Sequence, residues 1–110
     1  MPVKLEKNGD TLDVFLIGEI DHHSARDMRE CIDTSIEMIK PKRLVLDFGG
    51  VSFMDSSGVG LVMGRYKLVN FFEGIVTVRN TSPRIERILR MSGIEKIATI
   101  EKSKGEGVAV

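Results

Sequence analysis

The chain has 110 residues, a length that fits one domain able to bury roughly two thirds of its unfolded surface without a disulfide or a metal ion. Sixteen basic residues balance sixteen acidic ones and neither sign forms a block, so the chain lacks the charge pattern of a nucleic-acid-binding protein. The single cysteine and the lack of a signal peptide or a long apolar segment lead us to expect a cytoplasmic protein that does not contact membranes.

Two strands are predicted at the start of the chain. Residues 3–7 alternate weakly between polar and apolar side chains, and residues 12–20 are rich in β-forming residues. Asn8-Gly9 between them tolerates positive φ, which makes it a strong hairpin signal. We therefore expect these two strands to pair in the antiparallel direction.

A helix is predicted over residues 24–40, because apolar side chains recur there at helical spacing and Pro41 follows. Cys31 lies on the apolar stripe, which favours a place in the core over redox chemistry. His22-His23 precedes the helix, but neighbouring residues share no face and no third ligand lies near them in the sequence. We therefore assign these histidines to a loop or helix start and expect no metal ion.

Strands and helices alternate through the rest of the chain. Leu44-Val45-Leu46 is a short apolar run typical of a central strand. Further along we expect a helix over 59–69 that stops at Glu73-Gly74, a strand over 75–78, a helix capped by Ser82 that runs to Gly93, a strand over 96–100, and a frayed tail over 102–110.

This order predicts a single α/β domain over residues 1–110. An initial hairpin followed by alternating strands and helices indicates a mixed sheet that is mostly parallel, with right-handed crossovers and an antiparallel hairpin at its N-terminus. The α-helices then pack on the sheet, and no repeat or linker divides the chain.

The segment VSFMDSSGVGLVMGRYK, residues 51–67, places two serines between an acid and three glycines. The serines fall at the start of a helix that follows the carboxyl end of a central strand, where open α/β sheets usually carry their sites. One interpretation is that Asp55, Ser56 or Ser57 caps the helix. Another is that an exposed serine here is the substrate of a second protein, whose backbone the glycines allow to approach. Alternatively, the glycines do not serve a partner and instead let the helix pack against the protein's own sheet.

Nucleotide-binding and catalytic motifs fit this segment poorly. Gly58, Gly60 and Gly64 run G-x-G-x-x-x-G, whereas the dinucleotide fingerprint needs its third glycine one residue earlier and a turn directly after the strand. Residues 49–57 intervene instead. Neither a Walker loop nor a G-x-S-x-G elbow is present. We expect no enzymatic activity and no cofactor, and a small nucleotide-binding protein remains the alternative class.

Four segments of the chain form a recognisable set, namely GEIDHH (18–23), FMDSSGVG (53–60), MGRYK (63–67) and SPRIERILRMSGI (82–94). Together they resemble the anti-sigma factor antagonists of the STAS domain family, most of all the sporulation type that acts on anti-sigma-F factors, and the resemblance covers essentially the whole chain. It implies a small α/β fold and partner switching. In such switching the unphosphorylated protein binds an anti-sigma factor, which is a serine kinase with bound nucleotide, and the sigma factor is released. The kinase inactivates the antagonist by phosphorylation, and a metal-dependent serine phosphatase restores it.

The resemblance also implies roles for individual residues. The serine directly after the aspartate is the phosphorylation site, which here is Ser56, with Ser57 as its neighbour. Asp21 is expected near Ser56 with Asp55 beside it, where both shape the kinase contact. The expected partner-binding residues are Asp21, Met54, Asp55, Ser57, Gly58 and Gly60.

Two further expectations concern the partner and the pathway. Arg65 and Lys67 belong either to a solvated face or to a contact with acidic residues of the kinase. The free protein is expected to be a monomer, and a general stress pathway is the alternative setting within the family.

Overall fold

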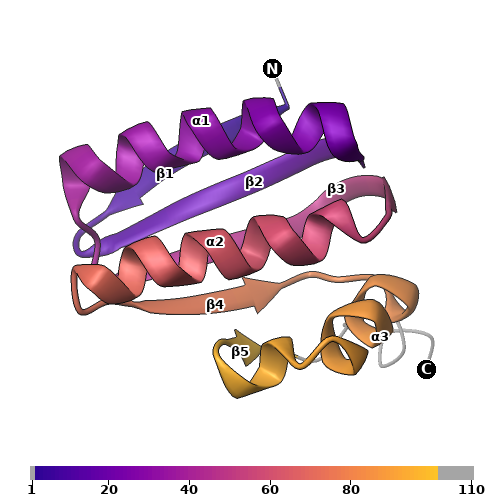
Figure 1. The fold of residues 1–110 in the computed structure, drawn as a ribbon. Helices are drawn as coiled ribbons and strands as arrows, with labels where there is room; N and C mark the ends of the chain where they lie inside the picture. The colour runs from indigo at the N-terminus through magenta and orange to yellow at the C-terminus, as the bar shows by residue number, and fades with distance from the viewer. Residues whose placement is uncertain (1, 102–110) are drawn as a thin grey trace, which may run out of the picture.

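The structure is a computed structural model that describes residues 2–101, and it forms one five-stranded sheet (Figure 1). The strands lie in chain order across the sheet, and they are β1 (Val3–Asn8), β2 (Thr11–Ile20), β3 (Arg43–Met54), β4 (Ile75–Arg79) and β5 (Thr99–Ile100). Strands β1 and β2 pair antiparallel, and the remaining neighbours pair parallel. The predicted α/β fold with a mixed sheet is therefore confirmed. The tail predicted to fray, residues 102–110, lies outside the described residues.

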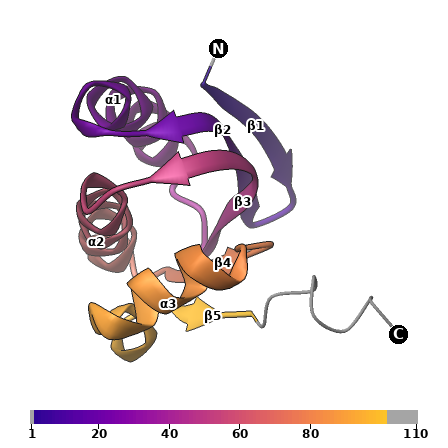
Figure 2. The ribbon, with the colours of Figure 1, turned by 90° about the vertical axis from the view of Figure 1, so that its right-hand side faces the viewer.

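The helices α1 (His22–Ile39) and α2 (Ser57–Phe71) lie side by side against one face of the sheet (Figures 1 and 2). Side chains from this face and from the two helices form most of the hydrophobic core, which also includes Ile85, Leu89, Ile94 and Ala98. Within residues 2–101, no helix is both long and apolar enough to cross a bilayer.

The hairpin consists of β1 (Val3–Asn8) and β2 (Thr11–Ile20). Asn8 pairs with Thr11, so the turn residues are Gly9 and Asp10, one position later than the predicted Asn8-Gly9. Gly9 takes the positive φ of 61° that favours glycine. Asn8 stays in the strand, where its side-chain amide donates to Asp13 Oδ2 at 2.7 Å.

Helix α1 (His22–Ile39) begins two residues earlier than predicted, because Asp21 and not a later residue is its N-cap. Asp21 and Ser24 form a capping box, in which each side chain bonds the backbone of the other. The helix ends at Ile39, and its C-cap Lys40 directly precedes Pro41. Cys31 is half-buried against the core, as its place on the apolar stripe predicted.

Strand β3 (Arg43–Met54) is the central strand and is much longer than the predicted run of residues 44–46. It pairs with β2 as far as Ile20 and Met54, so most of the segment expected to separate strand from helix is itself strand. Its pairing with β4 (Ile75–Arg79) ends at Asp47. The carboxyl half of β3 therefore extends past β4 together with the end of β2.

Helix α2 (Ser57–Phe71) follows β3 after two residues, and the chain leaves it through Glu73, which has a φ of 65°. Helix α3 (Pro83–Met91) has the predicted cap, since Ser82 Oγ accepts from the N–H of Ile85 at 3.2 Å. A short 3-10 helix η1 (Ile94–Lys96) then precedes β5 (Thr99–Ile100), so the last strand is shorter than predicted.

Candidate functional site

The ends of β2 and β3 place Asp21 and Asp55 at one edge of the sheet. Ile20 and Met54 are partners in the parallel pairing, and the N–H of Asp55 donates to the carbonyl of Ile20 at 3.2 Å. Asp21 and Asp55 are the next residues along these two strands, and each one leads into a helix. The edge therefore joins two strand ends and the starts of α1 and α2.

Asp55 is the residue that caps α2. Its Oδ1 accepts from the N–H of Ser57 at 2.8 Å. The next three N–H groups, those of residues 58–60, donate to the main-chain carbonyls of Asp55 and Ser56 at 3.0, 3.1 and 3.4 Å. The first turn of α2 therefore has its amide groups bonded already, and among the three candidate caps the role falls to Asp55.

Ser56 occupies the N-cap position but does not use its side chain there. Its backbone is already helical, with φ −62° and ψ −16°, and its side chain makes no hydrogen bond with any residue from 2 to 101. Ser56 is exposed, whereas Ser57 is half-buried. Of the two serines, Ser56 is therefore the one whose hydroxyl is accessible to a modifying enzyme.

Met54 and Gly58, two of the predicted partner-binding residues, are buried in the structure and not exposed at this edge. Met54 is 0% exposed, and a Cβ added to Gly58 would overlap its thioether. The glycine therefore lets the first turn of α2 pack onto Met54. For Gly58, this contact corresponds to the alternative in which the glycines pack against the protein's own sheet.

Phe53 is an exposed residue at this edge that the sequence reasoning missed. Its side chain is 41% exposed, and the Arg84 guanidinium at the start of α3 lies 5.7 Å from its ring centroid. Strand alternation explains its exposure, since the buried Met54 places Phe53 on the opposite face, but this signal is visible only once the segment is known to be a strand.

The carboxylate of Asp21 is held by the first turn of α1. It accepts from the N–H groups of Ser24 and His23 at 2.9 and 3.0 Å. The bond from the Ser24 backbone is the largest cause that lowers the pKa of Asp21 below its ordinary value. Asp21 is therefore negatively charged at neutral pH.

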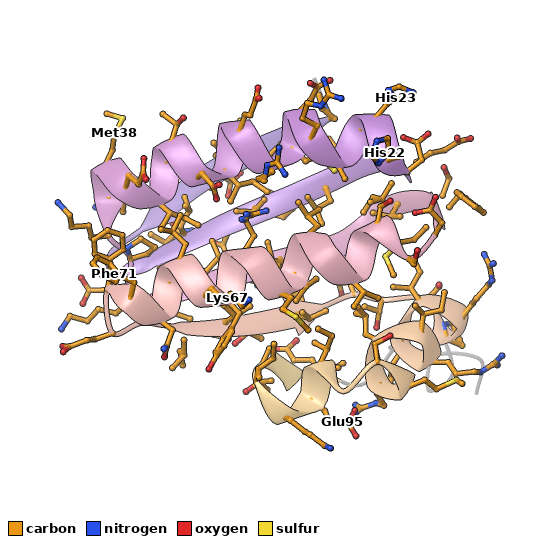
Figure 3. The ribbon with its side chains drawn as sticks, in the orientation of Figure 1. His22, His23, Met38, Lys67, Phe71 and Glu95 are labelled. Carbon is orange, nitrogen blue, oxygen red and sulfur yellow. The ribbon has the colours of Figure 1, made fainter. Side chains whose placement is uncertain are left out.

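His22 and His23 are the first two residues of α1, which fits the assignment to a helix start (Figure 3). Their ring centroids are 5.7 Å apart. Among residues 2–101, no group of three or more His, Cys, Asp or Glu side chains is arranged to hold a metal ion.

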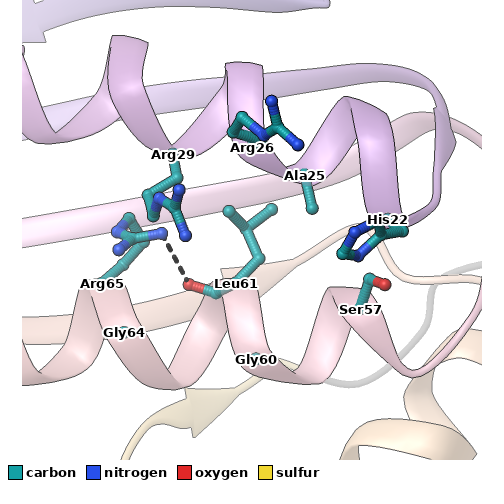
Figure 4. A pocket seen from close by; sticks show the side chains of 9 residues that line it. All are labelled: His22, Ala25, Arg26, Arg29, Ser57, Gly60, Leu61, Gly64 and Arg65. Carbon is teal, nitrogen blue, oxygen red and sulfur yellow. Dashed lines mark hydrogen bonds between the residues drawn. The ribbon is translucent and has the colours of Figure 1, made fainter.

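A groove of about 390 Å³ runs between α1 and α2 and begins at Ser57, which lies opposite His22 (Figure 4). It is lined by His22, Ala25, Arg26 and Arg29 from α1 and by Ser57, Gly60, Leu61, Gly64 and Arg65 from α2. Gly60 is exposed here, and no atom lies within 4 Å of the position that a Cβ would take. Of the predicted partner-binding glycines, Gly60 is the one that remains accessible.

Arg65 fits neither of the two alternatives that the sequence offered. It is only 5% exposed, its Nε lies 2.7 Å from Asp33 Oδ1, and its Nη1 donates to the Leu61 carbonyl at 3.3 Å. Burial lowers the pKa of Arg65 and raises that of Asp33. Asp33 lies on the neighbouring helix, and local spacing could not reveal it. Lys67 is exposed, and both alternatives remain open for it (Figure 3).

The STAS domain family profile matches residues 2–107 of the chain. The anti-sigma F factor antagonist of Paenibacillus polymyxa is 38% identical over 100 residues, which cover 91% of this chain and 86% of that protein. The anti-sigma-B factor antagonist of Bacillus subtilis is 33% identical over 105 residues, which cover 96% of this chain and 94% of that protein.

Two solved structures of the anti-sigma factor antagonist SpoIIAA are similar to the chain. The unphosphorylated form has a TM-score of 0.73 and 30% identity, with 97% of this chain and 94% of that one covered. The phosphorylated form, from Bacillus, has a TM-score of 0.71 and 31% identity, with 97% and 96% covered. The fold described above is thus similar to both phosphorylation states of that protein.

Proposed function

Because the chain belongs to the STAS domain family, we propose that it is an anti-sigma factor antagonist whose binding is switched off by phosphorylation of Ser56. Two curated relatives act as anti-sigma F factor antagonists, and these support the sporulation pathway as its setting. The partner is an anti-sigma factor that is also a serine kinase and carries its own nucleotide. The chain itself acts as a regulator in the cytoplasm, as a monomer when free, and catalyses no reaction.

The observation that carries the proposal is the free hydroxyl of Ser56. A serine at the start of a helix usually caps it, and its side chain is then engaged by the backbone. Here Asp55 accepts the capping bond from Ser57, and the exposed Ser56 side chain has no hydrogen-bond partner in residues 2–101. A kinase can therefore bind the Ser56 side chain in its active site without first breaking the hydrogen bond that caps α2.

The electrostatics of this edge support a switch that leaves the fold intact. A phosphoserine adds about −1.5 to −2 charge at neutral pH, and a helix N-terminus favours an anion by only about 0.3–1 kcal/mol. The N–H groups of residues 57–60 are already bonded, so these four amides are not free to bind the phosphate. Asp21 and Asp55 lie at the same edge, and a partner that covers it must bury the phosphate near both.

The test is mass spectrometry after incubation of the protein with ATP and the anti-sigma F factor of Paenibacillus polymyxa. We expect one phosphate on wild type, located on Ser56 and absent from Ser56→Ala. Ser57→Ala is the matched control and should be phosphorylated like wild type. Phosphate on Ser57 would contradict the assignment of the site, and no phosphate on either serine would contradict the proposed regulation. A serine phosphatase should then remove the phosphate and restore binding.

A general stress pathway is the second candidate, because the Bacillus subtilis anti-sigma-B factor antagonist covers 96% of this chain at 33% identity. The two settings differ in the partner and not in the chemistry at Ser56. Binding measured side by side to an anti-sigma F factor and to an anti-sigma-B factor separates them. We expect the tighter complex with the anti-sigma F factor, and a clear preference for the anti-sigma-B factor would reverse the assignment.

A further inference from the structure

The groove between α1 and α2, which we call the basic groove, is lined by three arginines. The charge of Arg29 acts on nearby Asp33 and opposes the rise in its pKa that burial causes, but Arg29 forms no ion pair with that carboxylate. Arg26 and Arg29 are both exposed, and neither forms an ion pair with any residue in the range 2–101. Arg65 is the exception, since Asp33 pairs with it. Among residues 2–101, no acidic side chain lines the groove, and the nearby charge of Arg29 contributes to lowering the pKa of Arg65.

The floor of the basic groove is kept open by glycines that the fold does not need for its own packing. No atom lies within 4 Å of a Cβ placed on Gly60 or on Gly64, in contrast to Gly58, where Met54 fills that space. Glycine is a poor helix former, so two glycines with empty space beside them disfavour the helix without a packing gain. An occupant that approaches the backbone of α2 closely would account for them.

The basic groove is continuous with the proposed phosphorylation site. Ser57 lines its end at the start of α2 and lies opposite His22, and Ser56 is the preceding residue (Figure 4). Any protein that holds Ser56 in its own active site therefore stands over the end of the groove. The same partner could reach the arginines without a second docking event.

We propose that the basic groove receives an acidic segment of the same anti-sigma factor that phosphorylates Ser56. This inference rests on the proposed function and adds the chemistry of the second contact. The unpaired charges, Arg26 and Arg29, lie one turn apart along α1, which suits successive carboxylates of a chain segment. A small anion would need donors that converge on one point, and the first-turn amides of α2 are already bonded. A phosphate on Ser56 would then also repel the acidic segment at the end of the groove.

The test compares dissociation constants for the anti-sigma F factor of Paenibacillus polymyxa, measured by surface plasmon resonance at low and at high salt. For Arg26→Glu combined with Arg29→Glu, we expect affinity at low salt to fall by about tenfold or more, with a smaller loss at high salt where charges are screened. Gly64→Leu changes no charge but places a side chain in the basic groove, and we expect it to weaken binding by blocking the groove. Circular dichroism checks that each variant is folded.

Lys7→Glu combined with Lys42→Glu is the matched control, because it makes the same change of net charge at exposed residues near the hairpin turn. We expect its affinity to stay within about twofold of wild type. Equal losses in both double variants would reduce the effect to net charge and overturn the proposal. Wild-type affinity in the groove variants would overturn it as well. Saturable shifts of the groove amides in an NMR titration with inorganic phosphate alone would identify a small-anion site instead.

The same complex separates the two proposals. If wild type binds and is phosphorylated on Ser56 while the groove variants bind equally well, the groove inference fails and the proposed function stands. If wild type neither binds nor is phosphorylated, the proposed function fails and the inference falls with it. Weaker binding of the groove variants together with normal phosphorylation of wild type supports both.

Discussion

Asp47 is the centre of a polar cluster on the sheet face that α1 and α2 do not cover. Its Oδ2 accepts from Arg79 Nε at 2.9 Å and from the Asn80 amide at 2.8 Å, and its Oδ1 accepts from the N–H of Gly49 at 2.8 Å. Arg79 also lies 3.6 Å from Asp13. Burial by itself raises the pKa of Asp47, but the three hydrogen bonds outweigh it, so its pKa lies below the ordinary value. The folded protein therefore favours the ionised form.

Asp47→Asn should destabilise the protein at neutral pH by about 1–3 kcal/mol, because Arg79 loses a charged partner. The lowered pKa stabilises the fold above the unfolded pKa of about 4, and this stabilisation is lost as the pH falls through the folded pKa. The difference in unfolding free energy between wild type and Asp47→Asn should therefore shrink below about pH 4. Urea unfolding at pH 7 and pH 3 measures it, and a difference that does not change with pH would rule out this role of Asp47.

Two of the three glycines in helix α2, Gly58 and Gly60, should respond in opposite directions to the same substitution. Gly58→Ala places a methyl group on buried Met54, and such overpacking costs about 1–3 kcal/mol, which exceeds the gain of about 1 kcal/mol in helix propensity. Gly60→Ala meets no atom and should stabilise the fold by about 0.5–1 kcal/mol. Thermal unfolding followed by circular dichroism measures the direction in which each alanine shifts the unfolding midpoint. The packing argument is wrong if the two alanines shift the midpoint in the same direction.

The elements that the sequence predicted well are those with local signals. The capped start of α3 at Ser82, the end of α1 before Pro41 and the hairpin itself depend on residues a few positions apart. The extent of β3 and the burial of Arg65 depend on distant residues, namely the register with β2 and the ion pair with Asp33. These long-range contacts leave no periodic signal, which is why the strand was predicted too short and the arginine was placed on the surface.

The candidate site was predicted in a similarly uneven way. Its position at the carboxyl end of the central strand follows from the rule for open α/β sheets, and the choice of Ser56 came from the resemblance. The inward direction of Met54 could not be read, because the segment before the serines was taken as a connection and not as a strand. When a segment is not predicted to be a strand, the alternation of its side chains cannot be used to assign them to the buried or the exposed face.

The fold as a whole places Ser56 at the edge of the sheet where two strands end and two helices begin. Strands β2 and β3 both extend past β4, and each passes directly into a helix that is capped by an aspartate. Because the side-chain caps are made by Asp21 and Asp55, the side chain of Ser56 makes no hydrogen bond within the described residues, and only its main-chain carbonyl bonds the first turn of α2. Its side chain can change charge while the elements that position it keep their hydrogen bonds.

Ser56→Asp should therefore separate stability from binding. We expect its melting temperature to stay within about 4 °C of wild type, since a charge at the helix start changes stability by less than about 1 kcal/mol. Its affinity for the anti-sigma factor should fall by roughly a hundred- to several-thousandfold, because an uncompensated buried charge costs about 3–5 kcal/mol. Ser56→Ala should bind like wild type, and Ser52→Asp adds the same charge to an exposed residue of β3 as a control. Wild-type affinity in Ser56→Asp would refute the electrostatic switch, and a large loss of stability would show that Ser56 supports the fold after all.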